Sequence, residues 1–87
     1  MNIDSAKQAA PLAVAIEAHA SMIARIELAI SEGWLISELW AAHPQTGSQQ
    51  QLVLSKLSPE TSAQGLAFAL QIYQGQLEAL NAQLTAL

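Results

Sequence analysis

Apolar residues recur at alternating steps of three and four along two long stretches of the chain, and charged residues are absent from these positions. A repeat averaging 3.5 residues is typical of helices that pack lengthwise against other helices. The sequence therefore predicts two long helices, at about 11–32 and about 59–86, joined by a connector at 33–58. The first seam comprises Leu12, Ile16, His19, Ile23, Ile26 and Ile30, and the second comprises Ala63, Leu66, Leu70, Tyr73, Leu77, Leu80, Leu84 and Leu87.

Local signals mark the ends of these helices. Gly33 stands where a left-handed residue would terminate the first helix. Ser58 and Pro59 supply an N-cap and a proline at the first position of the second helix. The start of the first helix has two possible forms, because proline disrupts a helix beyond its first turn. Either the helix begins near Pro11, or a short N-terminal helix meets it there at a kink.

The connector permits two interpretations. Residues 35–42 are predicted, by a slight preference, to form a short helix, although the same apolar run suits a strand. Residues 52–57 suit a strand that pairs with this run equally well, or a short helix that begins at a capping box of Ser48 and Gln51. The predicted fold is therefore mainly α, a long antiparallel helical hairpin with a compact connector. The alternative is an α+β fold with a short β-hairpin between the two long helices.

The amino-acid composition indicates that the hairpin packs against a partner. The chain has 87 residues, which suits one domain, and 52% of them are hydrophobic while only 11% are charged. An apolar excess of this size is hard to bury inside so short a chain. We therefore expect either a homodimer, closed as a four-helix bundle, or a partner protein that covers one face. The apolar residues outside the two seams support this expectation: Val14, Met22, Leu28, Phe68 and Ile72.

Charge and cysteine content exclude several functions. The formal net charge is −4, and the three cations, Lys7, Arg25 and Lys56, are scattered, so direct binding to nucleic acid or to an anionic membrane is not expected. The most apolar stretch contains Glu17 and Glu27, which argues against a membrane-spanning helix. The chain has no cysteine, which fits a cytoplasmic protein.

Candidate chemistry is sparse. The acidic residues are spread out, no phosphate-binding or nucleophile motif occurs, and His43 has no neighbouring ligand residues in the sequence. We therefore predict no catalytic residue, no metal site and no cofactor. In an antiparallel hairpin that pairs Ile30 with Ala63, His19 falls opposite Tyr73, and a hydrogen bond between them would satisfy both polar groups.

The candidate interface residues are the two tryptophans of the connector, Trp34 and Trp40, together with Phe68 and Ile72 on the second helix. The leading hypothesis is a non-enzymatic protein–protein interaction module, a small oligomeric adaptor, chaperone or inhibitor that acts by helix packing. Secretion-system chaperones and phage-encoded inhibitors are proteins of this size, an analogy of class alone. The alternatives are a structural subunit of a larger phage or secretion assembly, and a small ligand-binding bundle around His19 and Tyr73.

Overall fold

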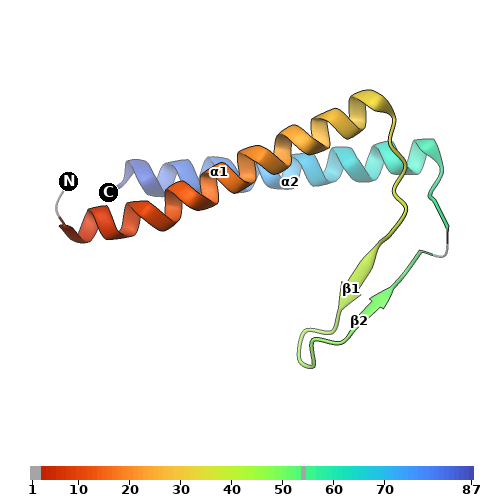
Figure 1. Ribbon diagram of the computed structural model, residues 1–87, viewed down its shortest axis with the longest axis horizontal. Coiled ribbons are helices and arrows are strands. Elements are labelled where there is room, and N and C mark those ends of the chain that lie inside the picture. Colours follow the sequence, from red (N-terminus) through yellow and green to blue (C-terminus); the bar gives the residue numbers. More distant parts are fainter. Residues whose placement is uncertain (1–2, 54) are drawn as a thin grey trace.

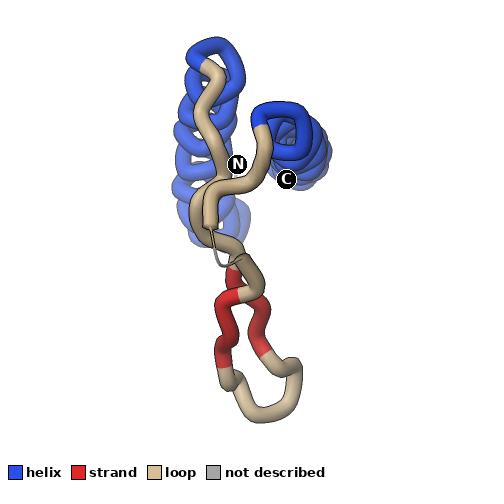
Figure 2. The backbone as a smooth tube through the Cα atoms, turned by 90° about the vertical axis from the view of Figure 1, so that its right-hand side faces the viewer, coloured by secondary structure: helices blue, strands red, loops and turns tan. Residues whose placement is uncertain are grey.

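The computed structural model describes residues 3–53 and 55–87 as an antiparallel helical hairpin with a β-hairpin between its two helices (Figure 1). The elements in chain order are α1 (Ile3–Glu32), β1 (Trp40–Ala42), β2 (Gln49–Gln51) and α2 (Pro59–Thr85). The two helices lie side by side, and the β-hairpin projects away from them at the end opposite the two termini (Figures 1 and 2). The mainly helical hairpin predicted from the seams is confirmed, and its connector takes the β-hairpin form.

Helix α1 begins at Ile3, well before Pro11, which lies inside the helix. A proline there removes the hydrogen bond that its nitrogen would donate to the carbonyl of Lys7. Because Lys7 is exposed, water can bind that carbonyl, and the helix continues through the proline. The prediction that the main helix begins at about residue 11 is therefore replaced by a single helix of 30 residues.

The end of α1 fixes the direction in which the connector leaves. Gly33 has a φ of 71°, its amide donates to the carbonyl of Ile30, and the amide of Trp34 donates to the carbonyl of Ala29. These two bonds define a Schellman motif, in which the left-handed residue satisfies the last carbonyls of the helix. The motif turns the chain away from the helix axis, so the tryptophan that follows the glycine does not extend the helix.

The connector forms two antiparallel legs that meet in a short sheet. Trp40 pairs with Gln51, and the legs are held together nearer the helices by bonds from the Leu52 amide to the Leu39 carbonyl and from the Leu57 amide to the Ile36 carbonyl. The predicted helix at 35–42 is wrong, because the backbone groups of this segment bond across to the returning leg. Ser48 and Gln51 likewise form no helical capping box, since Gln51 belongs to β2. Leu54 lies outside the described residues.

The apolar seams form the contact between α1 and α2. Of the seam residues predicted from the sequence, Ile26 is buried and most others are partly buried, whereas residues off the seams are mostly exposed. Among the described residues, the buried hydrophobic side chains are Ile26 and Ala29 of α1 and Val53 of the connector. The core is therefore a narrow strip between two helices, widened at one end by the connector.

The chain is far more open than a compact domain of its mass. Its accessible surface is 6571 Å², whereas a compact monomer of 9.2 kDa exposes about 4,900 Å². Its radius of gyration is 16.7 Å, against about 12 Å for a compact chain of this length. The overall dimensions are 52 × 36 × 14 Å, so the molecule is a thin layer from which the β-hairpin extends.

Candidate interaction site

The connector carries a group of exposed apolar side chains on an extension that we call the arm, residues 34–53. Trp34 and Trp40 are 57% and 54% exposed. An aromatic side chain that leaves more than half of its surface in water gains little of the free energy that its burial would supply. The large hydrophobic residues of the arm that remain exposed are Trp34, Leu35, Leu39, Trp40 and Leu52.

The root of the arm is fixed to α2 by one buried serine. The Ser62 side chain is completely buried, and its hydroxyl accepts a hydrogen bond from the Ile36 amide at 2.9 Å and donates to the Leu57 carbonyl at 3.4 Å. The Leu57 amide in turn donates to the Ile36 carbonyl, so both legs of the connector close on the same hydroxyl. Ile36 also packs over α2, where its Cδ1 atom lies 2.8 Å from the position a Cβ would take at Gly65. The arm is therefore anchored at a defined place on the helical layer.

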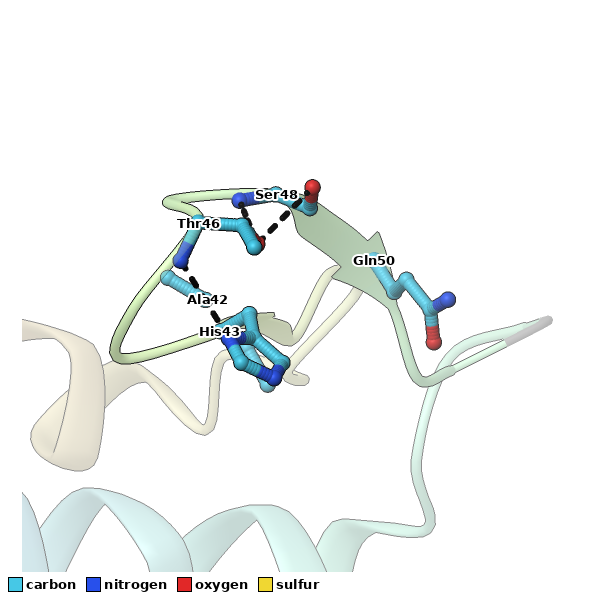
Figure 3. Close-up of a pocket in the computed structure, with 6 residues that line it drawn as sticks. Ala42, His43, Thr46, Ser48 and Gln50 are labelled. Carbon is cyan, nitrogen blue, oxygen red and sulfur yellow. Dashed lines mark hydrogen bonds between the residues drawn. The ribbon is translucent and has the colours of Figure 1, made fainter.

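The tip of the arm is a turn held by one imidazole. His43 Nδ1 accepts hydrogen bonds from the amide of Gln45 at 3.2 Å and from the amide of Thr46 at 3.3 Å, and Figure 3 shows the bond from Thr46. Because Nδ1 acts as an acceptor, the proton of the neutral ring is on Nε2. The turn closes through a left-handed Gly47, with a φ of 74°, whose amide donates to the His43 carbonyl. Ala41, Ala42, His43, Thr46, Ser48 and Gln50 line an open hollow of about 340 Å³ beside this turn.

Substituting His43 tests whether the imidazole holds the tip. An asparagine before a proline accepts bonds from the following amides in the same way, whereas alanine has no acceptor. We expect His43→Asn to preserve slow amide exchange at Gln45 and Thr46, and His43→Ala to accelerate it about five-fold, which corresponds to about 1 kcal/mol. Hydrogen exchange followed by NMR measures both, with Gln50→Ala as the control from the same hollow. Unchanged exchange in His43→Ala would show that the backbone alone sets the turn.

The two polar residues of the seams come together, but the hydrogen bonds of the imidazole go elsewhere. The rings of His19 and Tyr73 meet edge to face, with 5.5 Å between their centroids and 61° between their planes. His19 Nδ1 bonds to the Ala15 carbonyl at 2.8 Å, and its Nε2 lies 2.9 Å from Oε1 of Gln76. A bond between the imidazole and the phenol was expected, and the residue that the seam pattern missed is Gln76. It follows Tyr73 by three positions on the same side of α2.

The side chain of Gln76 can form a hydrogen bond with the imidazole of His19 whether or not the imidazole is charged. A carbonyl can only accept, so Nδ1 of His19 carries a proton in either state. The side-chain amide of Gln76 can present its oxygen to a protonated Nε2 or, after rotation, its NH₂ group to an unprotonated one. The pair therefore links α1 to α2 whichever state His19 adopts. It lies beside a shallow open hollow lined by His19, Gln76, Ala79, Leu80 and Gln83.

The predicted interface residues on α2 are also exposed. Phe68 is 65% exposed and Ile72 is 42% exposed, and both lie on the side of α2 that faces away from α1. We call the seam residues through which α1 and α2 pack against each other the inner seam. The placement of Phe68 and Ile72 follows from the helical period, since each is about half a turn from the inner seam of α2. The structure therefore leaves all four candidate interface residues in contact with solvent, in two groups: the tryptophans on the arm and the pair on α2.

No concentrated chemistry accompanies these surfaces in the described part of the chain. Its His, Asp and Glu side chains form no group of three that could hold a metal ion. None of its helices combines the length and the apolar character needed to cross a membrane. Comparison of the chain with family models, curated proteins and solved structures found no match in any of the three.

Proposed function

We propose that this chain is a non-enzymatic protein–protein interaction module, a small oligomeric adaptor, chaperone or inhibitor, in which the helical hairpin is the scaffold and the arm binds another protein. The observation that carries the proposal is the exposure of Trp34 and Trp40 on an arm with a fixed root. Tryptophan is enriched among the residues that dominate binding energy at protein interfaces. A partner would remove the apolar surface that this arm leaves in water.

The form of the arm supports recognition over simple packing. The side chains of β1 and β2 are exposed, so this short sheet adds nothing to the core of the hairpin. Its position is nevertheless defined, because Ser62 and the Ile36–Leu57 pair hold its root. A binding segment held in place before the partner arrives loses less conformational entropy on binding than a disordered one.

The composition of the surface indicates the chemistry of the partner. The arm's exposed apolar side chains are joined by few charges, with Glu38 bonded to the indole of Trp40 at 3.4 Å. The three cations of the chain are Lys7 and Arg25 on α1 and Lys56 near the root of the arm. This distribution suits an apolar groove on a protein better than an anionic polymer. A cytoplasmic location and the absence of catalytic activity are parts of the same proposal.

The test is a comparison of two substitutions on paired strands. Trp40→Thr replaces the indole with a β-branched side chain that suits a strand, and Gln50→Thr on β2 is the matched control. After a partner has been captured from the source cells and purified, its affinity is measured by calorimetry. We expect Trp40→Thr to weaken binding at least 30-fold, or about 2 kcal/mol, and Gln50→Thr to change it less than two-fold. Equal affinity of Trp40→Thr and the unmodified protein would contradict the proposal.

A further inference from the structure

Helix α2 carries a second apolar seam on the side opposite α1. We call it the outer stripe, and its residues follow one another at alternating steps of three and four, as the inner seam does. Phe68 and Ile72 are its large members, and small residues fill the rest. The outer stripe comprises Phe68, Ile72, Gly75, Ala79 and Ala82, all of them exposed, and it contains no charged residue.

We propose that the outer stripe packs against the outer stripe of a second copy of this chain, with the two α2 helices antiparallel and crossing near Ile72. The inference rests on the proposed function, because it names the partner of the helical scaffold. The product is a four-helix assembly in which each hairpin keeps its own inner seam. A heptad pattern that has no partner within its own chain is the pattern expected for a helix pair between chains.

The surface area supports a second copy. The chain exposes roughly 1,600 Å² more than a compact monomer of its mass. A stable homodimer buries about 1,000 Å² or more from each chain. The excess accessible surface is therefore of the size that such an interface needs.

The distribution of charged residues favours α2 over α1 as the helix that contacts the second copy. On α1, the exposed hydrophobic residue Val14 has Lys7 and Glu17 on the same outward side, one turn or two away. Bringing two such faces together would bury charged groups, which costs free energy unless each finds a partner. On α2, the two carboxylates Glu60 and Glu78 are about a quarter of a turn from the outer stripe. They would lie at the rim of the interface, in contact with water.

The sizes of the side chains select the antiparallel direction. Ile72 is the midpoint of α2, so an antiparallel pair that crosses there brings Phe68 of one chain near Gly75 of the other. Apart from its chain neighbours and the adjacent helix backbone, no atom lies within 4 Å of the position a Cβ would take at Gly75, so the glycine leaves space for a ring. A parallel pair would place Phe68 against Phe68 and Gly75 against Gly75. The two rings would then compete for the same space, and the space beside the two glycines would remain empty.

The absence of cysteine from the sequence makes a direct test possible. Light scattering on a size-exclusion column gives the mass, and oxidation of single-cysteine variants gives the geometry. We expect a dimer, and we expect Ile72→Cys to form a disulfide-linked dimer in high yield. Gln74→Cys should remain unlinked, because Gln74 is exposed and lies away from the outer stripe. Ala82→Cys should also remain unlinked, because the two copies of residue 82 are far apart in an antiparallel pair. Circular dichroism checks that each variant keeps its helicity.

The other outcomes separate this inference from the proposed function. A dimer in which Ala82→Cys links to itself overturns the antiparallel geometry. A dimer that links through Gln74→Cys and not through Ile72→Cys overturns the outer stripe as the interface, while an oligomeric module remains. A monomer at every protein concentration loaded on the column overturns the inference and the oligomeric part of the proposed function together. Binding of a partner by the arm is then decided separately by Trp40→Thr.

Discussion

Replacing Ile26 with alanine is expected to lower the free energy of unfolding by about 2–4 kcal/mol. Ile26 is 8% exposed and lies on the inner seam between α1 and α2. Its truncation removes buried methyl and methylene groups and leaves a cavity, and a core this narrow has few other side chains that can close around it. Urea denaturation followed by far-UV circular dichroism measures the change.

The matched control for Ile26→Ala is Leu28→Ala, two residues further along the same helix. Leu28 is 52% exposed, so its truncation should cost less than about 1 kcal/mol. Both variants must be compared at one protein concentration, since association would make the apparent stability concentration-dependent. If Ile26→Ala leaves no folded state, Ile26→Val should show a graded loss of about 1 kcal/mol. Equal losses in Ile26→Ala and Leu28→Ala would contradict a core confined to the inner seam.

The elements that the sequence predicted correctly are those set by local or periodic signals. The two seams predicted the pair of helices correctly, because a 3.5-residue period can be recognised within the sequence of one helix, independently of the rest of the fold. Gly33 and Ser58 fixed two helix ends, since a left-handed residue and an N-cap act on their neighbours alone. In the structure the Ser58 side chain accepts from the Thr61 amide, as an N-cap does.

The elements that sequence reasoning missed depend on contacts between distant segments. The sequence of residues 35–42 has no strong preference for helix or strand, and hydrogen bonds to the second leg of the connector determine its conformation. The continuation of α1 through Pro11 also depends on its surroundings, because the packing of Leu12 and Ile16 against α2 stabilises the whole helix. The position of His19 opposite Tyr73 followed from the predicted register, but the bond to Gln76 required the side-chain geometry.

Ser62 is the clearest case of a residue at the root of the arm whose contacts the sequence did not reveal. Ser62 lies next to the inner seam on the side of α2 that also carries Gln76. Its place beside the seam was the one indication in the sequence that it could be buried. Its burial, however, depends on Ile36 and Leu57 crossing over it from the connector. Periodicity within one helix cannot report a contact made by a segment outside both helices.

Substituting Ser62 with alanine is therefore expected to loosen the arm from the scaffold. The change leaves the part-buried Ile36 amide without its acceptor, at a cost of about 1–3 kcal/mol. Ser21→Ala, at an exposed position of α1, should change stability by less than about 0.5 kcal/mol. Urea denaturation measures both variants, and equal stabilities would show that the hydroxyl does not fix the root.

Amide hydrogen exchange tells where the Ser62→Ala effect acts. If the serine anchors the arm, exchange accelerates first at Ile36 and Leu57, while the amides in the middle of α2 change only with global stability. A partner that binds the arm would then bind Ser62→Ala more weakly although every exposed arm residue is intact, because the arm must be ordered again on binding. Unchanged affinity together with fast exchange at the root would mean that recognition needs the side chains of the arm but not its fixed position.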